Sequence, residues 1–344
     1  MFRWKIAGAL TLLLAAGFAG ATVGCGGDDD DVGGQPMPAT TSSATAAASP
    51  SPPATPALEA EAKPVLPAKV RDKDGQEVTV SDVSRIVVLN GDLTEVVYAL
   101  GLGESVVGVD TSATYPPEAQ AKPKIGYQRA LNAEGILSLQ PTVIIGSEVA
   151  GPPAVIEQVK GAGVPVVLFE AVRSLDDVGR KIENVAAALG VPNRGKLLAG
   201  RTQQEIDEAR ALAAKATTKP RVVFLYLRGS TTQAIAGKGT GGDAVITAAG
   251  GIDAGTEAGI VGSKPLTPEA LVAAAPDVIL VLTAGLQSVG GVDGLLQIPG
   301  VGQTPAGQQR RVVDLDDQYL LGLGPRAGQA LKELVLALHP ELRG

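Results

Sequence analysis

Short runs of β-branched and other apolar residues alternate with stretches of helical periodicity along most of the chain. The runs fall at residues 85–89, 106–109, 143–145 and 166–169, and return at 221–227, 233–236, 278–282 and 311–315. Because these runs are apolar at consecutive positions, they predict strands that are buried on both faces. Their alternation with helices predicts an α/β fold with mostly parallel sheets.

A weak internal repeat relates the two groups of strands. Leu-Asn-Ala-Glu at 131–134 is followed by Pro-Thr-Val-Ile at 141–144, and Leu-Thr-Pro-Glu at 266–269 is followed by Pro-Asp-Val-Ile at 276–279. Both segments are shifted by 135 positions, from 131 to 266 and from 141 to 276. Each copy has the order of a helix cap, a helix, a proline stop and a buried strand. The repeat therefore predicts two similar lobes.

The residues between these two groups have helical periodicity and almost no strand pattern. Apolar residues recur at helical spacing over 178–189, and a second helix is predicted over about 194–216. A helix of about 22 residues is about 33 Å long, which is enough to bridge two lobes. We therefore expect two Rossmann-like lobes, at residues 67–174 and 218–344, joined by a rigid helical bridge at 175–217.

The N-terminus has the features of an export signal. Arg3 and Lys5 precede an uncharged segment at 6–23, and small residues lead to Cys25, the only cysteine of the chain. One interpretation is a signal peptide over residues 1–24, cut before Cys25, whose thiol then takes a lipid. The other is an uncleaved transmembrane anchor, because the segment is near the minimum length for a membrane span. We favour the first, since Gly and Ala dilute the segment, and both place the folded chain outside the cytoplasm.

Residues 25–66 form a low-complexity segment. Four aspartates at 28–31 precede a run of Ala, Ser, Thr and Pro. Such a composition cannot bury enough apolar surface to offset the entropy lost on ordering. We expect a disordered tether between the lipidated cysteine and the folded lobes.

Charge and composition exclude several classes of function. The net charge of −7 argues against nucleic acid as a partner, because phosphate binding needs a basic face. The one histidine, His339, is expected at a solvated helix end. A His-rich zinc or manganese site and a Ser-His or Cys-His catalytic centre are therefore excluded. We do not expect an enzyme, although a mechanism that uses carboxylates alone is compatible with the composition.

Three segments resemble the helix-braced solute-binding proteins of ABC importers, which carry haem, cobalamin and siderophores. They are Leu-Asn-Gly-Asp-Leu-Thr-Glu at 89–95, Gly-Tyr-Gln-Arg at 126–129 and Leu-Leu-Gly-Leu-Gly at 320–324. The likeness covers the chain from about Lys69 onward and is greatest to the haem-binding lipoproteins. It implies a monomer, lipid-anchored at the outer face of the cell membrane, that delivers haem as cargo to an ABC permease with its ATPase. A cobalamin or ferric-siderophore protein on the same scaffold is the alternative, and a cell-envelope interaction domain or an enzyme is a weaker one.

The resemblance also implies that tyrosine holds the haem iron in a cleft between the lobes. In the family, the Gly-Tyr-x-Arg position supplies an axial iron ligand, which makes Tyr127 a candidate ligand and Arg129 a candidate partner for a haem propionate. Some members have a Tyr-x-Arg segment in the second lobe, matched here by Tyr226 and Arg228. Those members pair that tyrosine with a histidine in the first lobe, where this chain has Tyr127. Either tyrosine, or both, is therefore a candidate ligand.

The spacing of Tyr226 and Arg228 is compatible with this chemistry. Residues i and i+2 of a strand share a face, so the two side chains are expected side by side. A neighbouring cation favours the phenolate form of tyrosine, and tyrosine is an established ligand type for haem iron. From spacing alone, a packing tyrosine with a chance arginine neighbour stays open.

Each copy of the repeat places a glutamate, Glu134 or Glu269, in the first turn of a predicted helix. The helix dipole stabilises a carboxylate there by about 0.3–1 kcal/mol, which is reason enough for its presence. The resemblance implies a second role, in which both glutamates dock to arginines of the permease. Tyr115 and Tyr319 are expected at the rim of the cleft or in packing.

Overall fold

The computed structural model describes residues 63–343 of the 344-residue chain. The predicted export signal, Cys25 and most of the predicted tether lie outside the described residues. Among the helices that are described, none is long and apolar enough to cross a membrane. The last residues of the predicted tether contact the fold, because the N–H of Val65 donates a hydrogen bond to the carbonyl oxygen of Gly190 at 2.8 Å.

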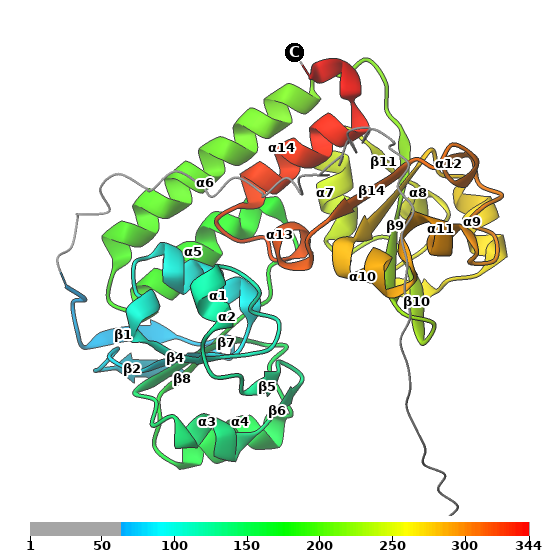
Figure 1. The fold of residues 1–344 in the computed structure, drawn as a ribbon. Coiled ribbons are helices and arrows are strands. Elements are labelled where there is room, and N and C mark those ends of the chain that lie inside the picture. The colour runs from blue at the N-terminus through cyan, green and yellow to red at the C-terminus, as the bar shows by residue number, and fades with distance from the viewer. Residues whose placement is uncertain (1–62, 344) are drawn as a thin grey trace, which may run out of the picture. The chain divides into compact units, whose positions relative to one another are not determined.

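The N-terminal lobe is built around a four-stranded sheet in which all neighbouring strands are parallel (Figure 1). In spatial order its strands are β4 (Val106–Val109), β3 (Ile86–Val88), β7 (Val143–Ser147) and β8 (Val166–Phe169). Its helices are α1 (Gly91–Ala99), α2 (Pro117–Gln120), α3 (Ala133–Ser138) and α4 (Pro153–Gly161), with a 3-10 turn η1 (Gly103–Ser105). Two hairpins are attached: β1 (Ala68–Arg71) with β2 (Glu77–Val80), and β5 (Gly126–Tyr127) with β6 (Ala130–Leu131). Strands β3, β7 and β8 are buried throughout, as the apolar runs that begin β7 and make up β3 and β8 predict.

The C-terminal lobe contains a six-stranded mixed sheet. Its strands are β9 (Arg221–Arg228), β10 (Thr232–Ala236), β11 (Ile252–Asp253), β12 (Ser263–Pro265), β13 (Val278–Leu282) and β14 (Val312–Leu315). Its helices are α7 (Gly242–Ala248), α8 (Ala254–Glu257), α9 (Pro268–Ala274), α10 (Thr283–Ser288), α11 (Gly291–Leu296), α12 (Pro305–Gln308), α13 (Asp317–Leu321) and α14 (Ala327–Leu338). The spatial order is β12-β10-β9-β13-β14, with β11 beside β9.

Three of the five strand pairs in this second sheet are parallel, in agreement with the predicted mostly parallel arrangement, and two are antiparallel. Strand β13 is parallel to both β9 and β14, as expected. Strand β10 is antiparallel to β9 and to β12. Only residues 229–231 separate β9 from β10, and a parallel crossover needs about a dozen residues or more. The short connection therefore dictates a hairpin, which the apolar pattern does not distinguish from a parallel strand.

Two helices occupy the predicted bridge, α5 (Val178–Ala188) and α6 (Pro192–Ala213), after a 3-10 turn η2 (Leu175–Asp177). Helix α6 has 22 residues, the length expected, and begins at a proline, which suits the first turn of a helix. It packs against α5 and lies alongside α14 (Figure 1). A side chain at Gly328 of α14 would overlap Glu205 of α6, so glycine permits this close helix contact. Part of the bridge is thus packed against an element of the second lobe.

The hydrophobic core continues from the first lobe through the bridge into the second. One cluster of buried residues includes Val88 of β3, Ile182 of α5, Phe224 of β9 and Leu331 of α14. The prediction that His339 is solvated is wrong, because its side chain is fully buried. Helix α14 ends at Leu338, and the turn into the final 3-10 segment η3 (Pro340–Leu342) directs the ring inward, where Nε2 lies 3.0 Å from the carbonyl oxygen of Ala249.

Candidate functional site

Tyr226 and Arg228 lie at the end of β9, and their side chains meet. The guanidinium carbon of Arg228 is 4.5 Å from the centroid of the Tyr226 ring. Both side chains are therefore on the same side of the strand, as the i, i+2 spacing predicts. The arginine covers the face of the ring in a cation–π arrangement.

Asp317 holds the Arg228 guanidinium in this position. Nη2 of Arg228 donates to Oδ1 of Asp317, and Nη1 donates to the carbonyl oxygen of Leu227 at 2.8 Å. The other carboxylate oxygen of Asp317 is buried without a hydrogen-bond partner. Sequence reasoning missed Asp317 because 89 positions separate it from Arg228 and only the packing of α13 beside β9 brings them together.

Tyr127 lies on the tight hairpin of β5 and β6, where it pairs with Ala130. The residue is 44% exposed, and Arg129 at the turn is exposed as well. Gly126 has φ = +102°, a conformation that side chains rarely adopt, and a Cβ there would lie 2.8 Å from the carbonyl oxygen of Ala130. The glycine thus permits the turn that presents Tyr127 and Arg129 to solvent, where a ligand can reach both.

The hairpin is anchored by Asn90, which belongs to segment 89–95, one of the segments on which the family resemblance rests. The buried side chain of Asn90 donates through Nδ2 to Oε1 of Gln128 and accepts at Oδ1 from the N–H of Ser147 at 2.8 Å. The carbonyl oxygen of Gln128 accepts from the N–H of Gly151 at 2.8 Å. Gln128 lies between the two exposed residues, Tyr127 and Arg129, and its hydrogen bonds fix the hairpin to the lobe.

A buried acid, Asp110, lies behind this hairpin at the end of β4. Its Oδ2 accepts from the N–H of Ser112 at 3.1 Å and from the Ser112 hydroxyl at 2.7 Å, whereas Oδ1 is buried without a partner. Burial raises the pKa of the Asp110 carboxyl from 3.8 to about 6. The carboxyl ends of parallel strands are the common ligand side of an α/β sheet. The hairpin with Tyr127 thus sits at the edge of the sheet where a cargo site is expected.

Two further tyrosines pack on an arginine between the lobes. The guanidinium carbon of Arg326 lies 3.5 Å from the ring centroid of Tyr115 and 4.9 Å from that of Tyr319. Arg326 also donates to both carboxylate oxygens of Glu95, at 3.0 and 2.9 Å. Burial raises the pKa of both the Tyr115 and the Tyr319 phenol, which favours their neutral forms. Tyr115 and Tyr319 therefore pack against Arg326, which is one of the two roles expected for them. Their neutral phenols are not suited to bind iron as phenolates.

Lys181 of α5 connects the bridge to both lobes. Its side chain is 3% exposed, and Nζ donates to Oδ2 of Asp92 at 2.9 Å and to the carbonyl oxygen of Gly322 at 2.6 Å. Asp92 belongs to α1, and Gly322 follows α13. Two of the three segments on which the family resemblance rests, 89–95 and 320–324, therefore both contact Lys181.

Glu134 and Glu269 occupy equivalent positions in the two lobes. Each lies in the first turn of its helix, α3 or α9, and each is exposed. The side chain of Asn132 caps α3 by accepting from the N–H of Glu134 at 2.9 Å, and that of Thr267 caps α9 by accepting from the N–H of Ala270 at 3.2 Å. Strands β7 and β13 follow these helices, so the repeat seen in the sequence is a repeat in the structure.

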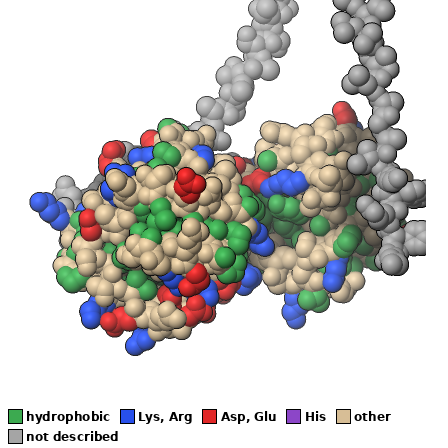
Figure 2. Space-filling view, turned by 90° about the horizontal axis from the view of Figure 1, so that it is seen from below, with side chains coloured by type: hydrophobic (Ala, Val, Ile, Leu, Met, Phe, Trp, Pro, Cys, Tyr) green, Lys and Arg blue, Asp and Glu red, His purple; other side chains and the backbone are tan. Residues whose placement is uncertain are grey.

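Hydrophobic, basic and acidic side chains are all visible near the junction of the two lobes (Figure 2). Within the described part of the chain, no group of three or more His, Cys, Asp and Glu residues is arranged to hold a metal ion.

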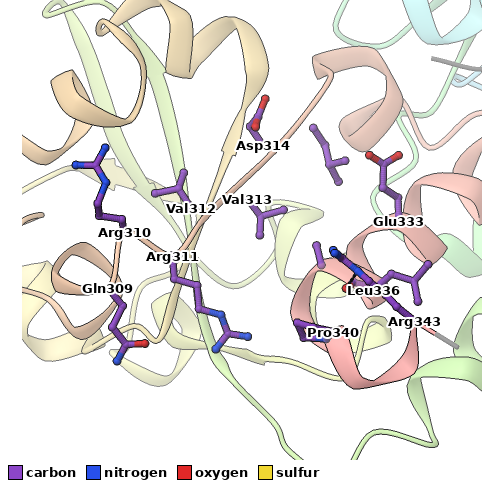
Figure 3. Close-up of a pocket in the computed structure, with 12 residues that line it drawn as sticks. Gln309, Arg310, Arg311, Val312, Val313, Asp314, Glu333, Leu336, Pro340 and Arg343 are labelled. Atoms are coloured by element: carbon purple, nitrogen blue, oxygen red, sulfur yellow. Dashed lines mark hydrogen bonds between the residues drawn. The ribbon is translucent and has the colours of Figure 1, made fainter. Parts of the chain in front are cut away.

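A cavity of about 780 Å³ lies elsewhere, between β14 and the C-terminal part of α14 (Figure 3). Three arginines line it, but each has a partner. Arg310 pairs with Asp293 at 2.6 Å, whereas Arg311 and Arg343 donate to backbone carbonyl oxygens of α14 at 2.8 and 3.0 Å. None of the candidate tyrosines lines this cavity. The placement of the site between the lobes, at Tyr127 and Tyr226, therefore stays a prediction.

Comparisons with known proteins agree with this architecture. Residues 86–319 match the family described as periplasmic binding protein. The chain is 57% identical to the solved periplasmic heme-binding protein RhuT from Roseiflexus sp. RS-1, with a TM-score of 0.74, over 76% of this chain and 100% of that chain. It is 29% identical to an uncharacterised ABC transporter substrate-binding lipoprotein, YvrC, of Bacillus subtilis, over 80% of this chain and 87% of that protein. It is also 30% identical to the vitamin B12-binding protein of Vibrio parahaemolyticus, over 42% of this chain and 51% of that protein.

Proposed function

Because the chain belongs to the periplasmic binding protein family, we propose that it is the haem-binding protein of an ABC importer, with haem as cargo and no reaction performed on it. The observation that carries this proposal is the stack of Arg228 on Tyr226, fixed by Asp317. A phenol oxygen with a cation held beside its ring suits ferric iron better than it suits an uncharged cargo. The 57% identity to a heme-binding protein over most of the chain supports the same cargo.

The two lobes contribute different groups to the proposed site. In the C-terminal lobe, Tyr226 offers its phenol oxygen to the iron. In the N-terminal lobe, Tyr127 is a second candidate ligand, and Arg129 is a partner for a propionate. Because both residues are exposed on an anchored hairpin, they reach cargo without a rearrangement of the lobe core.

Delivery is proposed to involve a permease and a membrane anchor. The exposed carboxylates of Glu134 and Glu269, one per lobe, form a symmetric pair that suits arginines on a two-subunit permease. Lipidation of Cys25 would hold the protein at the outer face of the membrane, in keeping with its lipoprotein relative. The net charge of −7 keeps nucleic acid outside the set of proposed partners.

Cobalamin is the second candidate cargo, favoured by the likeness to a vitamin B12-binding protein. Calorimetric titrations of the full chain with hemin and with cobalamin separate the two candidates. The proposal predicts saturable binding of hemin and affinity for cobalamin lower by at least about tenfold, which is about 1.4 kcal/mol in binding free energy. Tighter binding of cobalamin than of hemin would overturn the proposed cargo but leave the assignment as a binding protein in place.

A further inference from the structure

Gln318 lies in the first turn of α13, and both the oxygen and the nitrogen of its side-chain amide form hydrogen bonds to the N-terminal lobe. The residue is 7% exposed. Its Oε1 accepts from the N–H of Thr114 at 2.8 Å, from the N–H of Tyr115 at 3.0 Å and from the Thr114 hydroxyl at 3.1 Å. Its Nε2 donates to the carbonyl oxygens of Gly91 at 2.9 Å and Tyr115 at 3.1 Å, and to Oε2 of Glu95 at 3.2 Å. One side chain of the C-terminal lobe thus forms hydrogen bonds with four residues of the N-terminal lobe.

In the C-terminal lobe, Gln318 is next in sequence to Asp317, which supports the proposed iron ligand Tyr226 through Arg228. Asp317 precedes Gln318 in α13 and binds Arg228, which stacks on Tyr226. A displacement of α13 therefore moves the carboxylate that fixes the arginine.

On the side of the N-terminal lobe, hydrogen bonds continue from the amide to the hairpin with Tyr127. The N–H of Gly91 donates to the Ser112 hydroxyl at 3.1 Å, and that hydroxyl donates to Asp110 at 2.7 Å. The N–H of Thr111, the next residue, donates to the carbonyl oxygen of Gly126 at 2.9 Å. The amide is therefore linked to the base of the hairpin through Gly91 and segment 110–112.

We propose that Gln318 is a positioning residue that fixes the β5–β6 hairpin with Tyr127 and the end of β9 with Tyr226 relative to each other, and so supports haem binding without touching the cargo. This inference rests on the proposed function for the identity of the cargo. A primary amide presents donors and acceptors together. Leucine at this position would leave the N–H of Tyr115 without its partner, whereas the N–H of Thr114 would keep its hydrogen bond to the carbonyl oxygen of Ser112 at 3.0 Å. Glutamate would place a second carboxylate against Glu95 and an acceptor against two carbonyl oxygens.

The first test measures the spacing of the lobes without any cargo. Spin labels are attached at Ser138→Cys in α3 and Ser263→Cys in β12, both exposed positions, in the full chain with Cys25→Ser. Pulsed electron resonance then gives the distance distribution with and without Gln318→Leu. The matched control is Thr304→Val, which removes another buried hydrogen-bonding side chain of the same lobe, far from the α13 contact in the chain.

We expect the Gln318→Leu distribution to broaden or shift, and the Thr304→Val distribution to stay that of the wild type. Gln318→Asn, which keeps the amide but shortens its stem, should give an intermediate result and serves if the leucine variant does not fold. An unchanged distribution in both Gln318 variants, at a lowered melting temperature, would mean that the residue is structural only, and the inference would be wrong.

The second test measures hemin affinity on the same variants. For Gln318→Leu, hemin affinity should fall by about tenfold, as expected for loss of about 1.4 kcal/mol. Thr304→Val should keep the wild-type hemin affinity. An unchanged hemin affinity in Gln318→Leu refutes the positioning role. If the wild type does not bind hemin, the proposed function fails, and the distance measurement still decides whether Gln318 sets the lobe spacing.

Discussion

Replacing Glu95 by glutamine is expected to destabilise the protein more than any exposed charge change. The Glu95 side chain is 4% exposed and that of its partner Arg326 is 18% exposed. The carboxylate accepts from Nε at 3.0 Å and Nη2 at 2.9 Å, and Arg326 in turn is stacked by Tyr115 and Tyr319. Glu95→Gln removes the charge while the guanidinium stays in place between the lobes.

The expected magnitude follows from the burial of the pair. Breaking a buried ion pair by removing one partner costs about 3–5 kcal/mol, because the remaining charge is left uncompensated. For a domain of this size, each kcal/mol lowers the melting temperature by about 2–4 °C, so a decrease of roughly 10 °C is expected. The pair joins α1 to the segment before α14, and the loss therefore affects the contact between the lobes.

Urea denaturation and thermal melting measure this effect. Glu269→Gln is the control, because its glutamate is exposed in a first helical turn and should change the free energy of unfolding by about 1 kcal/mol or less. The double variant Glu95→Leu, Arg326→Met should recover much of the loss, since it leaves no unpaired charge. If Glu95→Gln stays within 1 kcal/mol of the wild type, the assignment of this pair as a buried interlobe contact is refuted.

Further predictions concern the candidate iron ligand Tyr226, the proposed docking residues Glu134 and Glu269, and the buried Asp110. Tyr226→Phe should weaken hemin binding by at least about tenfold, whereas Tyr98→Phe, whose hydroxyl has no partner, should not, and equal affinities would exclude Tyr226 as a ligand. Glu134→Ala with Glu269→Ala should abolish capture by the permease in reconstituted vesicles at unchanged hemin affinity, and retained capture would contradict the docking role. Because burial raises the pKa of Asp110 from 3.8 to about 6, its contribution to stability is present below about pH 4 and is lost as pH rises through 6, by about 3 kcal/mol. Urea denaturation from pH 4 to 7 should show this loss in the wild type but not in Asp110→Asn, and parallel profiles would contradict it.

The sequence was sufficient for most of the architecture, apart from the direction of β10, because the signals involved are local. Apolar runs such as those of β7 and β13 mark buried strands, and helical spacing over 178–189 marks the helix that the structure has at α5. The side-by-side placement of Tyr226 and Arg228 follows from the geometry of one strand. Such features depend on few residues close in the chain.

The contacts between the lobes were not predictable in the same way. Glu95 and Arg326 are 231 positions apart, and Gln318 and Thr114 are 204 apart, so neither pair leaves a local pattern. His339 was misjudged because a histidine before a proline at a helix end resembles a solvated terminus. Its burial depends on the turn at Ala249, which packs against α14 only in the folded chain.

The central claim is that Tyr226, with Arg228 beside it, binds the iron of a haem cargo. The most direct measurement is a titration of the full chain in detergent with hemin, followed by visible absorption. The account predicts a saturable shift of the Soret band together with a high-spin charge-transfer band, and loss of that band in Tyr226→Phe. No saturable change, or a spectrum that is the same in the variant, would contradict it.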